Sequence, residues 1–309
     1  MTAAESRTSP PAPAPGPVDR AAAEEASALG HPPVPPDATA AYGTHRDQVI
    51  DFYRPRVPLD RPAPLVAVLH GGAWRAAYDR AHISPLAAHL AAQGFAVACV
   101  EYRRGAAPDG PQQPSQGAPA PAGRWPETFD DVATALDALP ALALRTFGEE
   151  TVDAGRTLLT GHSAGGHLAL WAAARHVLPP DSPWHRSSPP PFRGVVALAP
   201  IADFTEAIRL RVCSGAVLDL LGGPDHLADR LPHADPAALL PTGIATTIVH
   251  GTTDNEVPPQ VTTAFATAAA AAGEEPVTVW LRETGHYALI DPSSPAAGAV
   301  ADEITQLAF

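Results

Sequence analysis

The stretch Arg156-Thr-Leu-Leu-Thr-Gly-His-Ser-Ala-Gly165 points most directly to the architecture of this chain. Residues 156–160 predict a buried strand, and the alanine-rich residues 164–175 predict a helix. Between them lies a G-x-S-x-G pattern, which is typical of a sharp strand-to-helix turn that exposes a serine hydroxyl. Glycines suit such a turn because the backbone segments pass closely. The pattern predicts Ser163 as a nucleophile; a glycine-rich helix start without chemistry is the alternative.

Short apolar strands alternate with helical segments from Leu65 to the C-terminus. Such alternation predicts an α/β fold with a mostly parallel sheet and helices on both faces. Active sites of these sheets lie at the carboxyl ends of the strands. The predicted strands are 65–69, 95–100, 156–160, 195–198, 246–249 and 277–281, with an edge strand within 45–53. The predicted helices are 83–93, one that starts at Pro126, 164–175, 261–272 and 296–307.

A serine nucleophile needs a base, and in folds of this kind an acid and then a histidine follow the serine along the chain. His286 follows the last predicted strand and is the only histidine beyond Asp254. Asp254 follows the strand 246–249 by a short loop, where a carboxylate is held rigidly. We therefore predict His286 as the base and Asp254 as the acid that orients it. Asp203, which also follows a strand, is the alternative acid.

The segment His70-Gly71-Gly72-Ala73-Trp74 follows the strand 65–69. Acyl transfer develops negative charge on an oxygen, and a Gly-Gly loop exposes backbone N–H groups that stabilise it. The residue after the nucleophile supplies a further N–H group. The sequence thus predicts an oxyanion hole built from Gly71, Gly72 and Ala164, with a turn of no catalytic role as the alternative.

Several aromatic and basic residues are candidates for a substrate pocket, although aromatic side chains more often fill a core. We expect Trp74, Tyr78, Trp125 and Tyr287 to contact substrate, and Phe204 is a further candidate. His162 is more consistent with a structural role. Arg103 and Arg104 follow a strand and could meet a substrate carboxylate, although solvated arginines are the simpler interpretation.

Composition excludes several classes of function. The net charge of −13 makes nucleic acid an unexpected partner, and the absence of lysine excludes Schiff-base and P-loop chemistry. We find no clustered metal-ligand pattern and expect neither metal nor cofactor. No apolar run approaches the roughly 20 residues that span a bilayer. With two isolated cysteines and no apparent signal peptide, we expect a cytoplasmic monomer or homodimer that acts on a small molecule.

Three segments differ in their expected organisation. Residues 1–40 are rich in proline and alanine and predict a disordered tail. Residues 41–309 predict one hydrolase domain. Within that domain, residues 204–240 are helical in character with breaks at glycine and proline, which predicts a small cap-like insertion over the sheet.

The motifs His70-Gly-Gly-Ala-Trp74 and Gly161-His-Ser-Ala-Gly-Gly-His-Leu168 resemble those of the kynurenine formamidase branch of the α/β-hydrolase superfamily. They are also similar to those of hormone-sensitive-lipase-like esterases, which more often have glycine at the position of Ala73 and an acidic residue at that of His162. Both departures favour the formamidase-like branch. The resemblance covers residues from about Tyr42 to the C-terminus.

The resemblance implies a serine hydrolase that cleaves an aryl formamide such as N-formylkynurenine through an acyl-enzyme. The alternative substrate class is a short-chain carboxylic ester. A third reading is a non-catalytic binding protein on the same scaffold, since a fold does not determine a function. Retention of Ser163, Asp254 and His286 argues against that reading.

Overall fold

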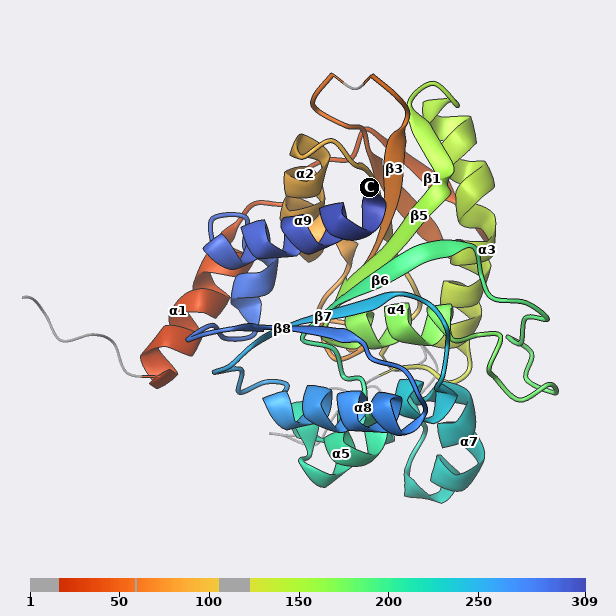
Figure 1. Cartoon of the computed structure of the whole chain (residues 1–309), viewed down its shortest axis with the longest axis vertical. Coiled ribbons are helices and arrows are strands. Elements are labelled where there is room, and N and C mark those ends of the chain that lie inside the picture. Colours follow the sequence, from red (N-terminus) through yellow and green to blue (C-terminus); the bar gives the residue numbers. More distant parts are fainter. Residues whose placement is uncertain (1–16, 59, 106–122) are drawn as a thin grey trace, which may run out of the picture.

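An eight-stranded sheet forms the centre of the computed structural model, which describes residues 17–58, 60–105 and 123–309 (Figure 1). The strand order is β1-β2-β4-β3-β5-β6-β7-β8. β1 pairs antiparallel with β2 and β2 antiparallel with β4, whereas the remaining pairs are parallel. The bounds are β1 Ala38–Ala41, β2 Val49–Tyr53, β3 Ala63–Leu69, β4 Ala96–Val100, β5 Val152–His162, β6 Phe192–Leu198, β7 Thr246–Gly251 and β8 Val277–Leu281.

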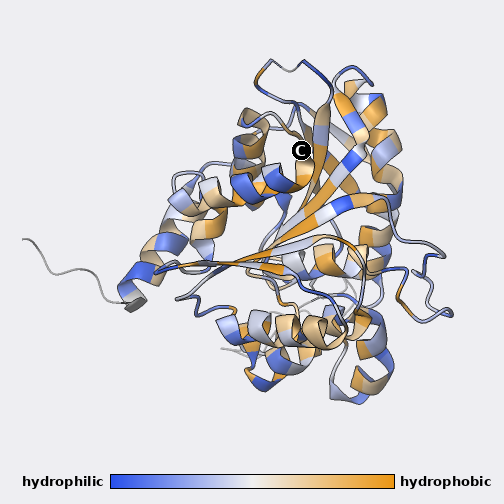
Figure 2. Ribbon diagram, viewed as in Figure 1, coloured by the Kyte–Doolittle hydropathy of each residue, from blue (hydrophilic) through white to orange (hydrophobic). Residues whose placement is uncertain are grey.

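Helices cover both faces of this sheet. α2 (Arg80–Ala92) and α9 (Pro295–Ala308) pack on one face, and α3 (Glu127–Phe147), α4 (Ala164–Ala173) and α8 (Pro259–Ala271) pack on the other (Figure 1). Apolar residues concentrate in the central strands, which are buried on both sides as parallel strands require (Figure 2). Every predicted strand and helix is present, and the predicted α/β-hydrolase fold is confirmed.

The prediction that residues 1–40 form a disordered tail is wrong for residues 17–40. α1 (Pro17–Gly30) packs against the short 3₁₀ helix η4 (Tyr287–Ile290), and β1 extends the sheet. Ala28 is buried, and Ser27 Oγ donates to Asp291 Oδ2 at 2.5 Å. A helix of this length depends on docking rather than on its own propensity, and composition does not report docking. Residues 1–16 of the predicted tail lie outside the described residues.

The stretch expected to form a cap-like insertion consists of short helices between β6 and β7. These are α5 (Phe204–Arg209), α6 (Ala216–Leu220) and α7 (Leu227–Ala234), with three 3₁₀ turns between and after them. Phe204 anchors the insertion because its fully buried ring stacks on His167 of α4 with centroids 4.5 Å apart. The insertion therefore lies next to the helix that follows the predicted nucleophile.

Candidate active site

Ser163 lies at the turn between β5 and α4, as predicted. Its backbone has φ 57° and ψ −116°, a region that costs a non-glycine residue about 1–3 kcal/mol. A Cβ on Gly161 would lie 2.3 Å from the carbonyl oxygen of Gly165. A Cβ on Gly165 would lie 2.0 Å from that of Leu69. Both motif glycines are therefore required by close backbone contacts that hold the serine in its strained conformation.

His286 and Asp254 meet across the loops that follow β8 and β7. His286 Nδ1 donates to Asp254 Oδ2 at 2.7 Å, and Asp254 Oδ1 accepts two backbone N–H groups of its own loop. Burial alone would raise the pKa of Asp254, but His286 and a hydrogen bond from His250 offset burial and hold this pKa well below its usual value. The alternative acid, Asp203, instead caps α5 by accepting from the N–H of Glu206 at 2.8 Å.

Ser163 and His286 line one cavity of about 200 Å³. A larger cavity of about 360 Å³, between α4, α8 and the start of β7, contains none of the predicted site residues. The candidate site is therefore identified by the presence of Ser163 and His286 in one cavity lining, and not by cavity volume. Its lining includes six residues that the sequence patterns did not indicate, because distant elements bring them together: Leu29, Arg75, His82, Cys213, Ser214 and Glu256.

The predicted oxyanion loop lies beside Ser163, but the residues of the loop that line the cavity are Gly72 and Ala73, whereas Gly71 and Gly72 were predicted. Gly72 lines the cavity and has φ +100°, which favours glycine. Gly71, also predicted as a donor, does not line the cavity and packs against the backbone of β5. Ala73 lines the cavity in its place. Ala164 begins α4, where the first N–H groups have no acceptor within the helix.

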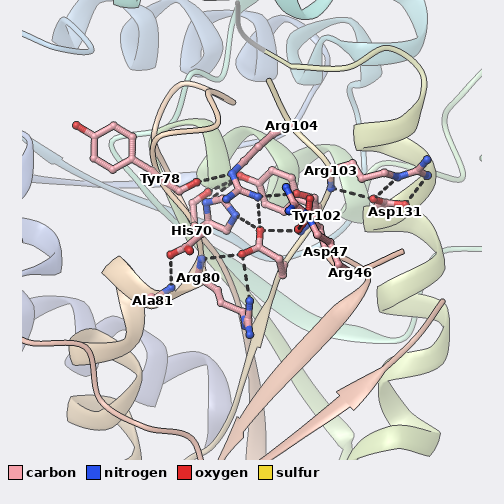
Figure 3. A network of polar contacts seen from close by, with 12 residues as sticks. Arg46, Asp47, His70, Tyr78, Arg80, Ala81, Tyr102, Arg103, Arg104 and Asp131 are labelled. Carbon is pink, nitrogen blue, oxygen red and sulfur yellow. Dashed lines mark hydrogen bonds and ion pairs between the residues drawn. The ribbon is translucent and has the colours of Figure 1, made fainter. Parts of the chain in front are cut away.

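A buried polar network includes His70, the residue that precedes the two glycines of the oxyanion loop (Figure 3). His70 Nε2 donates to Glu101 Oε1 at 2.9 Å, and His70 Nδ1 lies 2.9 Å from the carbonyl oxygen of the next residue. The Tyr102 hydroxyl donates to the carbonyl of His70 at 2.7 Å. Burial would raise the pKa of Glu101, but His70, Arg104 and the backbone N–H of Arg80 lower it to about 2. The network thus holds the ionised carboxylate of Glu101 against His70, next to the glycines in the sequence.

The two arginines considered for substrate binding belong to internal ion pairs instead. Arg104 Nη1 donates to Glu101 at 2.7 Å, and Arg103 binds Asp131 through Nε at 2.8 Å and Nη2 at 2.7 Å (Figure 3). Neither arginine lines the cavity. Glu101 lies three residues before Arg104, whereas Asp131 lies 28 residues beyond Arg103, and no local pattern indicated either pair.

The structure divides the predicted aromatic contacts. Tyr78 and Tyr287 line the cavity. The predictions for Trp74 and Trp125 are wrong: Trp74 is fully buried in the core, and Trp125 packs against Phe129 and Trp184. Phe204 is also buried. These large rings fill the space between α3, α4 and the insertion. Burial of their apolar area there stabilises the fold.

The site holds two further histidines. His162 Nε2 donates to the carbonyl of His286 at 3.0 Å, which agrees with its expected structural role. His82 on α2 lines the cavity, and burial lowers its pKa to about 4. Among the described residues, no group of three or more His, Cys, Asp or Glu side chains is placed to hold a metal ion. Within the same residues, no helix has the length and apolar character needed to cross a bilayer.

Residues 50–268 match the sequence model of the BD-FAE family. The chain belongs to the BD-FAE family. Among curated proteins, this BD-FAE member is 29% identical over 171 residues to the probable carboxylic ester hydrolase LipM of Mycobacterium tuberculosis, covering 55% of the chain and 35% of LipM. It is 27% identical over 234 residues to the probable isoprenylcysteine alpha-carbonyl methylesterase ICME of Oryza sativa, covering 73% of the chain and 51% of ICME.

The chain thus spans between about a third and a half of the length of these two relatives. Its fold is similar to that of the crystal structure of esterase B from Lactobacillus rhamnosis, with a TM-score of 0.70 and 21% identity. That likeness covers 94% of this chain and 92% of the esterase, and it supports the α/β-hydrolase fold.

Proposed function

We propose that this protein is a serine hydrolase that cleaves short-chain carboxylic esters. The observation that carries the proposal is that Ser163 and His286 line the same small cavity, while Asp254 Oδ2 accepts a hydrogen bond from His286 Nδ1 at 2.7 Å. A cavity of about 200 Å³ suits a short acyl group. Relatives named as carboxylic ester hydrolases and methylesterases support the ester over the aryl formamide that the motifs favoured.

The proposed reaction uses the geometry directly. His286 Nε2 removes the proton from Ser163 Oγ, which attacks the ester carbonyl and forms a tetrahedral oxyanion. The N–H groups of Gly72, Ala73 and Ala164 stabilise this oxygen; one such donor is typically worth about 3–4 kcal/mol. The imidazolium then protonates the alcohol oxygen as the C–O bond breaks. Water, activated by the same histidine, releases the acid from Ser163.

Asp254 fixes the histidine in the tautomer that this reaction needs. Its carboxylate accepts from Nδ1, so the unprotonated Nε2 is available to act as the base. The lowered pKa of Asp254 keeps the carboxylate ionised throughout the neutral range. The ion pair formed when His286 takes up the serine proton is thereby stabilised.

The test compares kcat/KM for p-nitrophenyl acetate, p-nitrophenyl butyrate and N-formylkynurenine in the wild type and in Ser163→Ala. We expect ester turnover that falls by a factor on the order of 10⁴ or more in the variant, without a change in melting temperature. Preference for the formamide would reverse the choice of substrate. Failure of a fluorophosphonate to label Ser163 would favour a non-catalytic binding protein.

A further inference from the structure

A second cavity with His286 in its wall, of about 180 Å³, lies beside the first, which contains Ser163. The two cavities share Glu256, His286 and Tyr287 in their linings, so these three residues lie between or beside both spaces. The remaining wall of the second cavity comes from Asn255 and from one face of α1: Ala21, Ala22 and Glu25. The N-terminal helix therefore completes a space next to the proposed acid–base residue.

Four side chains of α1 and the segment after it fix this wall to the chain around His286. Arg20 Nη1 donates to the carbonyl of Glu283 at 3.2 Å, and Glu24 Oε1 accepts from the N–H of Gly285 at 3.1 Å. Ser27 and His31 bind the two carboxylate oxygens of Asp291 at 2.5 and 2.8 Å. These contacts lie on both sides of His286 in the sequence, so α1 and the histidine loop form one unit.

The chemistry of ester cleavage assigns the two cavities different roles. The acyl carbonyl must lie between Ser163 and the N–H groups of Gly72 and Ala73, in the first cavity. The leaving oxygen must lie within hydrogen-bond reach of His286, which returns the proton to it. The alcohol portion of the substrate then extends past His286, and the second cavity is the space that the structure offers it.

We infer that the cavity beneath α1 is the leaving-group subsite, and that it takes a compact alcohol bearing a positive charge. This inference rests on the proposed esterase function. The walls contributed by Ala21 and Ala22 limit the size of the group. Glu25 and Glu256 place two carboxylates on the same cavity, and its described lining contains no lysine or arginine. An anionic leaving group is disfavoured for the same reason.

The first test varies the size of the alcohol while the acyl group stays acetyl. Methyl acetate is compared with 3,3-dimethylbutyl acetate in the wild type, in Ala21→Leu, which fills the cavity, and in Ala23→Leu, an exposed control on the same helix that does not line the cavity. We expect Ala21→Leu to lower kcat/KM for the bulky ester at least about tenfold and for methyl acetate less than about twofold. Equal losses for the two esters, or no loss, would overturn the assignment.

The second test varies charge at constant shape, with acetylcholine against 3,3-dimethylbutyl acetate. We expect the wild type to prefer the cationic ester, and Glu25→Gln to reduce that preference about two- to fivefold, as suits an exposed charge. Asp19→Asn removes an exposed charge from the same helix away from the cavity and should leave the preference unchanged. A preference unaltered in Glu25→Gln, or reduced equally in both variants, would contradict the inferred charge selectivity.

The two hypotheses fail differently. If the wild type hydrolyses methyl acetate but Ala21→Leu does not discriminate between the alcohols, the subsite is wrong and the esterase proposal survives. If no acetate is hydrolysed by the wild type, the proposed function and the subsite are both wrong.

Discussion

The two halves of the candidate site are built in different ways. Ser163 and the oxyanion loop follow β5 and β3, adjacent strands at the centre of the sheet, and a buried network around Glu101 supports them. His286 follows β8, the edge strand, on which Val277 is 56% and Trp280 40% exposed. The first half thus depends on the core, whereas the second depends on a few side-chain contacts.

Three of these contacts involve His286 or the residue before it. Asp254 accepts from the His286 ring, His162 donates to the His286 carbonyl, and Glu24 accepts from the N–H of Gly285. The residues that make two of these contacts, His162 and Glu24, lie more than 100 residues away from the histidine loop in the sequence. An edge strand leaves its loop without a neighbouring strand on one side, so these contacts provide the order that packing provides around Ser163.

The largest effect should come from breaking the contact between Asp254 and His286. Asp254→Asn favours the tautomer with a proton on Nε2, which cannot accept the serine proton, and we expect kcat to fall by a factor on the order of 10⁴. Asp203→Asn is the matched control, because Asp203 caps α5 and does not contact His286. Steady-state kinetics with p-nitrophenyl acetate decide the comparison. Equal losses in the two variants would refute the assignment of the acid.

On the serine half, Glu101→Gln should destabilise the fold as well as the site. Removal of the charge leaves Arg104 without its ionised partner, and breaking a buried pair typically costs about 3–5 kcal/mol. We expect a lower melting temperature, and a kcat reduced about tenfold with little change in KM, because a neutral amide accepts a weaker hydrogen bond from His70 and positions the oxyanion loop less firmly. Glu149→Gln, at an exposed glutamate, is the control. A raised KM with an unchanged kcat would argue against a role in transition-state stabilisation.

The stabilisation that Glu101 gives to the serine half should depend on pH. The pKa of Glu101 falls from 4.5 to about 2 on folding, so its ionised form stabilises the folded state fully above pH 4.5. This stabilisation is lost as the pH falls from 4.5 to about 2. The difference in free energy of unfolding between the wild type and Glu101→Gln should therefore narrow over that range. Urea unfolding at pH 6, 4 and 3 measures it; a difference constant with pH would show that the carboxylate charge is not the cause.

The contrast also explains how far the sequence could be interpreted. Ser163, the glycines and their flanking strand and helix form a local pattern, so the fold and the nucleophile were predictable. His286 followed from chain order, because no other histidine lies beyond Asp254. The roles of α1 and Glu101 were not predictable, since each depends on partners far along the chain. Trp74 and Trp125 were misassigned because an aromatic residue near a motif has the same local sequence whether it faces the core or a cavity.

The smallest effect should come from Glu24, a positioning residue in the helix that composition suggested was a tail. Glu24→Ala removes the acceptor for the N–H of Gly285, the residue before the proposed base. Since one hydrogen bond contributes about 0.5–1.5 kcal/mol, we expect kcat to fall about two- to tenfold with KM nearly unchanged. Glu24→Gln retains an acceptor oxygen and should recover most of the activity. A purely structural role predicts instead that both variants lose melting temperature while kcat per folded molecule stays constant, and active-site titration with a fluorophosphonate separates the two outcomes.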